Sequence, residues 1–208
     1  MNKRCVQVNK EHYFGDKYNH KARWLSYYYQ IKEVINLKPA KILEIGTGNG
    51  LVAKYLRERN YNLTTLDLDK ELKPDITASV LKMPVEDNSF DLILCAEVLE
   101  HLPFENFSQA LDEIKRVAKN NVILSLPDHR RTLLNFTVKF PFIRQFNIFI
   151  KIPSFKKHKF DGQHYWEIGK SGYSVSKIKE NIKKSGLKII DNFVPFDAPS
   201  NHYFILEK

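Results

Sequence analysis

Cysteine is scarce in this sequence. Of its 208 residues only two, Cys5 and Cys95, are cysteines, and they lie far apart in the chain. Two distant thiols exclude a disulfide-stapled scaffold and are typical of a reducing compartment. The first residues, Met1 to Gln7, also lack the apolar run that a secretory signal requires. We therefore expect a cytoplasmic protein. The seven histidines and two cysteines show no metal-ligand spacing, so no metal ion is predicted.

Acidic residues are absent from one long stretch of the chain. Residues 129–160 contain no Asp or Glu, so their basic residues supply +8 of the net charge of +9. The same stretch holds seven of the fourteen phenylalanines. A basic surface usually indicates an anionic partner such as nucleic acid or a membrane. The eight basic residues are Arg130, Arg131, Lys139, Arg144, Lys151, Lys156, Lys157 and Lys159.

The rest of the sequence alternates between short apolar runs and helical patterns. Its length suits one domain over residues 1–208, with an N-terminal helix at about 20–37. Such alternation predicts a doubly wound, mostly parallel α/β sheet. The last two runs are expected to pair as an antiparallel C-terminal hairpin. The predicted strands are 41–45, 63–66, 75–78, 90–95, 121–126, 187–194 and 202–206, and further helices are predicted near 51–59, from 103 onward, and at 174–184.

A glycine-rich loop follows the first predicted strand. Gly46, Gly48 and Gly50 form a G-x-G-x-G pattern, preceded by Glu44. Glycines allow a ligand to approach the backbone, and the helix that follows offers free N–H groups. The pattern differs from the G-x-G-x-x-G of dinucleotide folds, and the Glu44 carboxylate would suit an ammonium group better than a pyrophosphate. Asp67 ends the second strand, where an acid can accept the hydroxyls of a ribose.

Together with residues 81–102, LKMPVEDNSFDLILCAEVLEHL, these features resemble the class I S-adenosylmethionine-dependent methyltransferases, of the small-molecule or lipid type (methyltransferase type 11-like). The resemblance covers about residues 38–127. It implies a Rossmann-like sheet of seven strands, the cofactor S-adenosylmethionine and the product S-adenosylhomocysteine. The short stretch between the second and third strands predicts an abbreviated or missing helix there.

The resemblance also implies roles for individual residues. Glu44 and the three glycines would line the amino-acid end of the cofactor. Asp67 would bind the ribose, with Asp69 as its competitor, and Leu68 would pack on the adenine. Ser79 and Val80 take the place where many relatives have an acid that meets the adenine amino group. Ala96 and Glu97 would form the floor between the cofactor and the acceptor.

Methyl transfer is an in-line displacement that needs positioning and, for some acceptors, a base. The candidate bases are His101, Glu97, Asp128 and His164. His101 follows the fourth strand, at the edge where open α/β sheets bind ligands, although it could simply cap the next helix. His164 could contact the acceptor, or form a buried structural pair with Trp166. We predict His101 and His164 as the catalytic residues.

The basic stretch lies in a predicted insertion at about 128–165 over the active site. Residues 141–151 have a helical apolar pattern, formed by Phe142, Ile143, Phe146, Phe149 and Ile150. Residues 133–152 are too interrupted by Lys139, Pro141 and Arg144 to span a membrane. Three interpretations remain open: a lid packed on its own domain, a helix bound at an anionic membrane surface, and, ranked last, an RNA contact.

The sequence therefore predicts methyl transfer from S-adenosylmethionine to a small-molecule or lipid-like acceptor, such as a quinone or a lipid-carried glycan. A peripheral position at the inner face of the membrane would suit such an acceptor. Two alternatives stay open. The chain could be a non-catalytic, cofactor-binding partner protein that docks through its basic helix, or, less favoured, an RNA methyltransferase. Nucleic acid is otherwise not expected as a partner.

Overall fold

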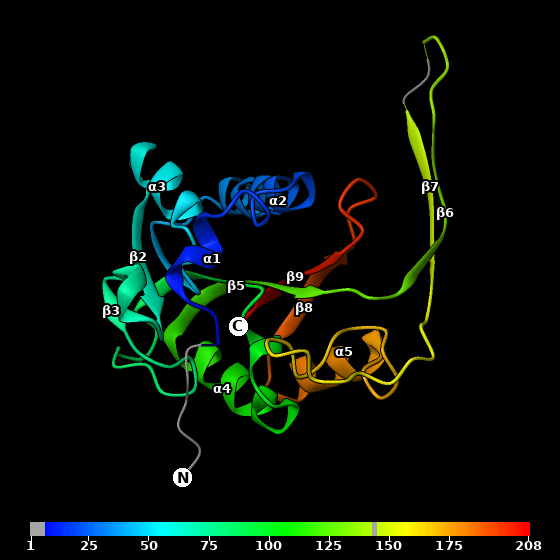
Figure 1. Cartoon of the computed structure of the whole chain (residues 1–208). Coiled ribbons are helices and arrows are strands. Elements are labelled where there is room, and N and C mark those ends of the chain that lie inside the picture. Colours follow the sequence, from blue (N-terminus) through cyan, green and yellow to red (C-terminus); the bar gives the residue numbers. More distant parts are fainter. Residues whose placement is uncertain (1–6, 143–144) are drawn as a thin grey trace.

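A seven-stranded sheet forms the centre of the molecule (Figure 1). The computed structural model describes residues 7–142 and 145–208. The strand order is β3-β2-β1-β4-β5-β9-β8, and only β9 runs antiparallel to its neighbours. This confirms the predicted mostly parallel sheet with a C-terminal hairpin. The strands are β1 (Lys41–Ile45), β2 (Asn62–Asp67), β3 (Ile76–Thr77), β4 (Phe90–Ala96), β5 (Ala118–Pro127), β8 (Lys188–Phe193) and β9 (Asn201–Glu207).

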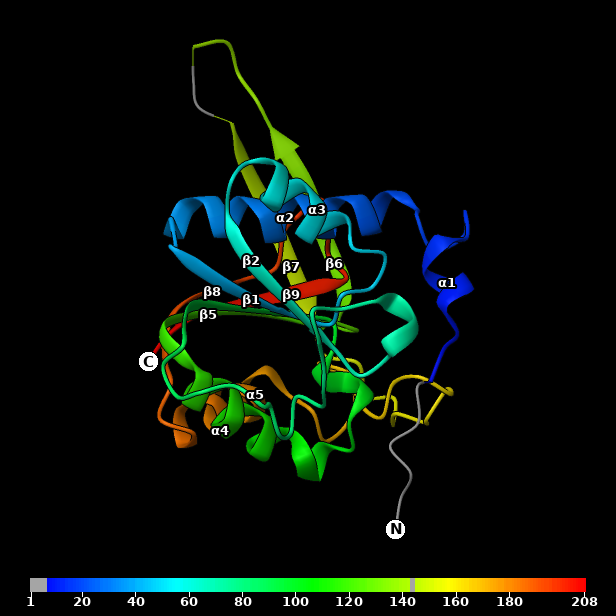
Figure 2. The same ribbon diagram turned by 90° about the vertical axis from the view of Figure 1, so that its left-hand side faces the viewer.

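The central strands are apolar because helices cover both faces of the sheet (Figure 2). In β4, the four residues from Leu92 to Cys95 are completely buried. Helices α2 (Lys21–Leu37) and α3 (Leu51–Glu58) cover one face, and α4 (Phe107–Val117) and α5 (Val175–Lys184) cover the other. Between β2 and β3 the structure has only the short 3-10 turn η1 (Lys70–Leu72), as the brevity of that stretch predicts.

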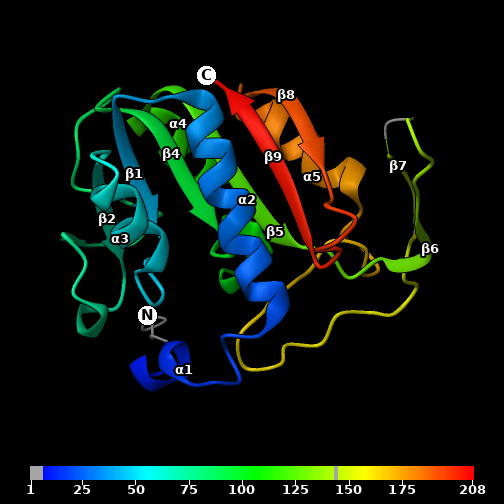
Figure 3. The ribbon, with the colours of Figure 1, turned by 90° about the horizontal axis from the view of Figure 1, so that it is seen from above.

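The N-terminal helix lies where the sequence predicts it, but it does not cap the crevice by itself. Helix α2 packs along the sheet through Tyr27, Tyr29 and Val34. The short helix α1 (Lys10–Phe14) lies instead beyond the carboxyl ends of β1 and β4 (Figure 3). No helix within the described ranges is long and apolar enough to cross a lipid bilayer.

The helix predicted over 141–151 is wrong. Strands β6 (Arg131–Val138) and β7 (Phe146–Ile152) form an antiparallel ribbon that leaves the sheet (Figure 1), so this part of the insertion does not cover the active site. Ile143 and Arg144 lie outside the described residues. The segment is rich in Ile and Phe, which favour strands, and β6 pairs with it along one edge. The apolar spacing in 141–151 therefore resembles that of a helix, although part of this segment forms β7 and pairs with β6.

A buried ion cluster anchors the ribbon to the sheet. Asp128, at the end of β5, contacts Arg130 at 2.6 Å and Lys151 at 3.0 Å, and His202 of β9 at 3.4 Å. Burial by itself would raise the pKa of Asp128, but the hydrogen bonds from His202 and Arg130 and the Lys151 ammonium hold it well below its usual range. Asp128 therefore stays ionised.

The chain after the ribbon returns to the main core. Trp166 is fully buried, its Nε1 donates to the Leu102 carbonyl at 3.0 Å, and its ring packs edge-on against Phe104 and Phe107. The segment that follows the insertion is thus part of the same hydrophobic core as α4.

We expect Trp166→Ala to lower the free energy of unfolding by about 3–5 kcal/mol, because it removes a large buried side chain and leaves a cavity. Urea denaturation followed by circular dichroism measures this. The matched control is Trp24→Ala, because Trp24 is 54% exposed. Equal effects of the two substitutions would contradict the assigned role of Trp166.

Candidate functional site

The glycine-rich loop lies at the point where the strand order of the sheet reverses. Strand β1 pairs in parallel with β2 on one side and β4 on the other, and the loop joins β1 to α3. In open α/β sheets the ligand crevice forms at this reversal, beyond the carboxyl ends of the strands. The residues that end β1, β2 and β4 therefore meet at one edge.

Glycine is required at two positions of the loop. Gly46 has a φ of +86°, and a Cβ there would lie 2.3 Å from Cγ2 of Val98. Gly48 has a φ of +54°, and a Cβ there would contact Tyr13 and Tyr18, which belong to the segment around α1. Gly50 is also in the left-handed region and caps α3. Side chains on these residues would strain the loop and close the approach to its backbone.

Glu44 presents a buried carboxylate beneath this loop. Its Oε2 has no hydrogen-bond partner within the described chain. Burial raises the pKa of Glu44 to about 8, with a further rise from Asp67 and an opposing effect of Arg57. A buried acceptor without a partner is costly, and a ligand ammonium would supply both the hydrogen bond and the counter-charge.

Asp67 holds the loop to the end of β2. Its Oδ2 accepts from the Thr47 N–H at 2.7 Å, and its Oδ1 accepts from the Asp69 N–H at 2.9 Å. Each carboxylate oxygen retains a lone pair for a ligand hydroxyl. The Asp69 side chain instead caps η1 by accepting from the Glu71 N–H. Asp67 thus keeps free lone pairs at the end of β2, and its contact with the ribose stays a prediction.

The predicted adenine region lies beside Asp67. Leu68 is exposed next to it, and the Ala78 N–H donates to the Asp67 carbonyl at 2.9 Å, which brings residues 78–80 to the end of β2. The Ser79 hydroxyl accepts from the Leu81 N–H at 3.2 Å, whereas the Val80 side chain is buried in the core. Only the backbone of Val80 is therefore positioned to face a ligand.

Strand β4 ends in a sharp turn. Ala96 closes the strand, and Glu97 follows with a φ of +57°. The backbone N–H of Glu97 donates to the Ser125 carbonyl, and its Oε1 accepts from the Ser125 hydroxyl at 3.1 Å. Both residues thus lie at the carboxyl edge of the sheet, where the sequence predicts them.

His101 and His164 meet although they lie far apart in the sequence. Their ring centroids are 5.0 Å apart and their planes are nearly perpendicular. Burial lowers the pKa of His101 to about 4, with His164 contributing to the fall. Burial also opposes protonation of His164, but its hydrogen bond to Glu167 raises the pKa above the usual value. The structure does not place Asp128 in this group, because the ion cluster at the ribbon occupies its oxygens.

Three residues near the histidines were missed by the sequence reasoning. Glu100 is completely buried directly before His101, in the run Glu-Val-Leu-Glu-His, where its position after a strand could have identified it. The Arg23 guanidinium lies 4.5 Å above the Tyr18 ring. Burial raises the pKa of Glu97 and of Glu100, and the positive charge of Arg23 opposes that rise. No local pattern marks Tyr18 or Arg23, because they arrive from α2 and the segment before it.

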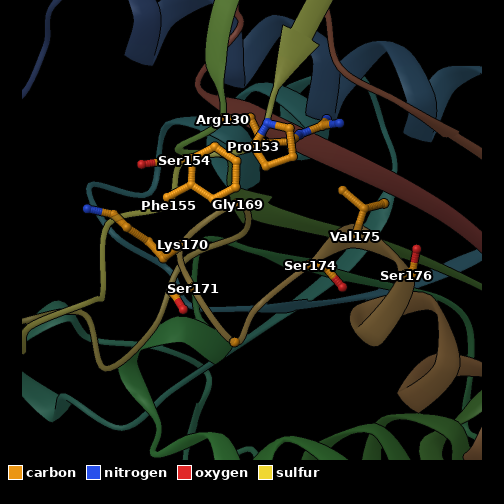
Figure 4. A pocket seen from close by; sticks show the side chains of 11 residues that line it. Arg130, Pro153, Ser154, Phe155, Gly169, Lys170, Ser171, Ser174, Val175 and Ser176 are labelled. Atoms are coloured by element: carbon orange, nitrogen blue, oxygen red, sulfur yellow. The ribbon is translucent and has the colours of Figure 1, made fainter.

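A separate cavity of about 460 Å³ lies between the base of the ribbon and α5 (Figure 4). Pro153, Phe155 and Val175 are among the side chains around it. Its two cations are already paired, Arg130 with Asp128 at 2.6 Å and Lys170 with Glu167 at 3.5 Å. The cavity is therefore not a ready anion site, and it lies apart from the glycine loop.

The chain has clear relatives. A family model described as a methyltransferase domain matches residues 43–126. An uncharacterized protein of Methanocaldococcus jannaschii is 34% identical over 184 residues, which is 84% of this chain and 77% of that protein. A ubiquinone biosynthesis O-methyltransferase of Rickettsia typhi is 28% identical over 110 residues, 47% of this chain and 44% of that enzyme. The match thus spans less than half of the Rickettsia enzyme.

Solved structures share the fold. The 1,6-didemethyltoxoflavin-N1-methyltransferase of Burkholderia thailandensis, solved with S-adenosylhomocysteine, superposes with a TM-score of 0.61 at 14% identity, covering 91% of this chain and 79% of that one. A S-adenosylmethionine-dependent methyltransferase of Clostridium acetobutylicum gives a TM-score of 0.64 at 11% identity, covering 96% and 99%.

The sheet order and the glycine loop define the class: a Rossmann-like α/β fold with a ligand crevice at the β1 reversal. The chain belongs to the class I S-adenosylmethionine-dependent methyltransferases, and S-adenosylmethionine is its cofactor. The residues present fit this cofactor. The unpartnered oxygen of Glu44 suits its ammonium group, the glycines leave the loop backbone accessible, and Asp67 suits its ribose.

We expect the affinity for S-adenosylhomocysteine to rise with pH up to about pH 8, because an ammonium pairs with the ionised form of Glu44 and burial keeps that group protonated below its pKa of about 8. Binding near about pH 7 should therefore release a proton. Calorimetry in buffers of different ionisation enthalpy measures both effects. Glu44→Gln should remove the proton release, and an unchanged release in this variant would contradict the assignment.

We expect Asp67→Ala to weaken binding of S-adenosylhomocysteine by about tenfold to a hundredfold, since a hydrogen bond to a charged group contributes about 1.5–3 kcal/mol. Asp69→Ala, with its cap on η1 removed, should weaken binding less. Calorimetric titration of both variants, with thermal unfolding to check the fold, separates the two carboxylates. A larger loss with Asp69→Ala would reverse the assignment.

Proposed function

We propose that the protein methylates an oxygen atom of a small, lipid-like acceptor. In this proposal Glu44 binds the cofactor ammonium, the backbone at Gly46, Gly48 and Gly50 lines its amino-acid end, and Asp67 binds its ribose. Leu68, Ser79 and Val80 border the adenine. Ala96 and Glu97 form the floor between the cofactor and the acceptor. The acceptor binds on the side of His101 and His164. The observation that carries the lipid-like acceptor is the exposed apolar surface of the β6–β7 ribbon.

Methyl transfer from the cofactor requires mainly that the protein position the two reactants. The cofactor supplies an electrophilic methyl group and leaves as a neutral thioether. The acceptor oxygen must therefore be held in line with that methyl, and its proton must pass to a base, which in this proposal is one of the two imidazoles. His101 and His164 are the side chains that meet the acceptor oxygen in this proposal. Glu167 orients His164 through a hydrogen bond of 2.9 Å.

The β6–β7 ribbon presents apolar side chains without a covering partner in the described chain. Leu133 is 65% exposed and Phe140 is 52% exposed, and Phe136, Phe146 and Ile150 are also exposed. Arg131 and Lys139 are exposed on the described part of the ribbon, whereas Arg130 and Lys151 at its base pair with Asp128. Apolar insertion combined with basic residues is typical of binding to anionic lipid surfaces.

The ribbon and the acceptor side are connected along the chain. The segment that leaves β7 returns to the crevice, where the Gln163 carbonyl contacts His101 at 3.1 Å and His164 follows. The same segment thus joins the ribbon, where this proposal places the lipid surface, to the histidines on the acceptor side. Several relatives are ubiquinone biosynthesis O-methyltransferases, which supports an oxygen acceptor on a lipid-like molecule.

Incubation with methyl-labelled S-adenosylmethionine and fractionated lipid extract tests the activity. We expect label in an apolar product from the intact protein. His164→Ala should lower kcat by about 100-fold or more, within the range of acid–base effects, while the affinity for S-adenosylhomocysteine stays unchanged. Bound cofactor without label transfer to any fraction would instead favour the non-catalytic partner protein. Label in RNA alone would favour the RNA methyltransferase.

Vesicle sedimentation tests the ribbon. We expect binding to anionic vesicles at low salt, weaker binding to neutral vesicles, and loss of binding with the double variant Phe136→Ser, Phe146→Ser. Ile190→Ser is the matched control, because Ile190 is 51% exposed on β8, away from the ribbon. Equal binding to anionic and neutral vesicles would contradict the electrostatic part of the proposal.

A further inference from the structure

Glu100 is an unusual acid in this site. Its side chain is completely buried, and both of its carboxylate oxygens lack a hydrogen-bond partner within the described chain. Within the described ranges Glu100 forms no ion pair with a lysine or arginine, and the nearby Arg23 guanidinium stacks on the Tyr18 ring. A buried carboxylate without partners is strongly unfavourable in the folded protein. The Glu100 carboxylate therefore indicates a binding partner that the described chain does not provide.

Two histidines stand beside this carboxylate. One ligand atom each of Glu100, His101 and His164 can be chosen so that all three lie within 4.8 Å of one another. His101 follows Glu100 on the turn after β4, and His164 meets it from the segment that follows the ribbon. Three potential ligands from two distant segments thus converge on one point at the acceptor side of the crevice.

The hydrogen bonds of the two imidazoles leave the same nitrogen free in each ring. Nδ1 of His101 faces two oxygens, Gln7 Oε1 at 2.7 Å and the Gln163 carbonyl at 3.1 Å. Nδ1 of His164 faces Glu167 Oε1 at 2.9 Å. In both rings Nδ1 is therefore the donor, and Nε2 carries the lone pair. Histidines that bind metals are oriented in this way by a carboxylate or a carbonyl.

We propose that Glu100, His101 and His164 bind a divalent transition-metal ion. Two imidazole nitrogens and one carboxylate oxygen suit zinc and its first-row neighbours, whereas magnesium and calcium prefer all-oxygen sites. Three protein ligands leave coordination positions open, as in metal sites that also bind a substrate. With the ion bound, such a position would hold the acceptor oxygen, and the ion rather than an imidazole would promote the loss of its proton. The ion would supply the positive charge that Glu100 lacks. Glu167 and Gln7 act as positioning residues.

The neighbouring cluster of Asp161, His164 and Glu167 is a weaker candidate. Asp161 is exposed, and its Oδ1 already accepts from the N–H groups of Gln163 and His164. Glu167 is surrounded by His164 at 2.9 Å, Lys170 at 3.5 Å and His158 at 3.7 Å. Its charge is thus balanced within the chain, in contrast to that of Glu100.

The site could not be derived from spacing along the chain. Glu100 and His101 are adjacent, but the third ligand follows only after the whole ribbon insertion, so no short metal-binding motif exists. The inference rests on the proposed function in one respect only: that function makes the ion's position the acceptor side of the crevice. The binding of an ion can be measured without any acceptor.

Titration of the full-length, chelator-treated protein with Zn²⁺ and with Co²⁺ tests the proposal. We expect one ion per chain by calorimetry, with the intense visible absorption of a low-symmetry Co²⁺ site. Glu100→Gln, His101→Ala and His164→Ala should each abolish stoichiometric binding. Glu167→Gln should weaken it by about 10- to 100-fold. His20→Ala, which removes a histidine at the start of α2, should change neither the stoichiometry nor the affinity.

Binding of S-adenosylhomocysteine and thermal unfolding are measured on the same samples. They show that each variant is folded, and they separate the failure of this inference from that of the proposed function. If Glu100→Gln does not fold, the partly exposed His164 still provides the test through His164→Ala. The proposal is overturned if the intact protein binds no ion at about 0.1 mM, or if the His164→Ala variant binds it as tightly as the intact protein.

Discussion

The parallel pairing of β1 with both β2 and β4 is the constraint on which the site depends. It places three strand ends at one edge and makes their loops diverge, so that a crevice opens where the sheet reverses. Glu44, Asp67 and Glu97 come to that edge from three different strands or their ends. The hydrogen bond from the Thr47 N–H to Asp67 then fastens the glycine loop to the neighbouring strand.

Most of the fold could be predicted because its signals are local. A strand segment buried on both faces is apolar, and β4 shows this in its sequence from Leu92 to Cys95. The ribbon could not be predicted in the same way. Its strands have no buried face, so their apolar residues follow no burial pattern, and the spacing of Phe146, Phe149 and Ile150 imitates a helix. Only the pairing with β6 decides the conformation.

The residues of the candidate site fall into the same two groups: some have local sequence signals, and others depend on contacts between distant segments. The glycine loop and Asp67 adjoin predicted strands, so their place in the crevice follows from the order of the sheet. His101 and Glu97 follow β4 and could be placed for the same reason. The meeting of His164 with His101 depends on the return path of a long insertion. The contacts of Tyr13 and Tyr18 with the glycine loop depend on how the N-terminal segment packs, which no residue pattern encodes.

The ion cluster around Asp128 has a mechanical consequence. Its four members come from the end of β5, the start and end of the ribbon, and β9, and the Lys151 ammonium also donates to the Pro199 carbonyl. These contacts therefore fix the base of the ribbon to the sheet. A surface bound by the ribbon would therefore always face the same side of the sheet.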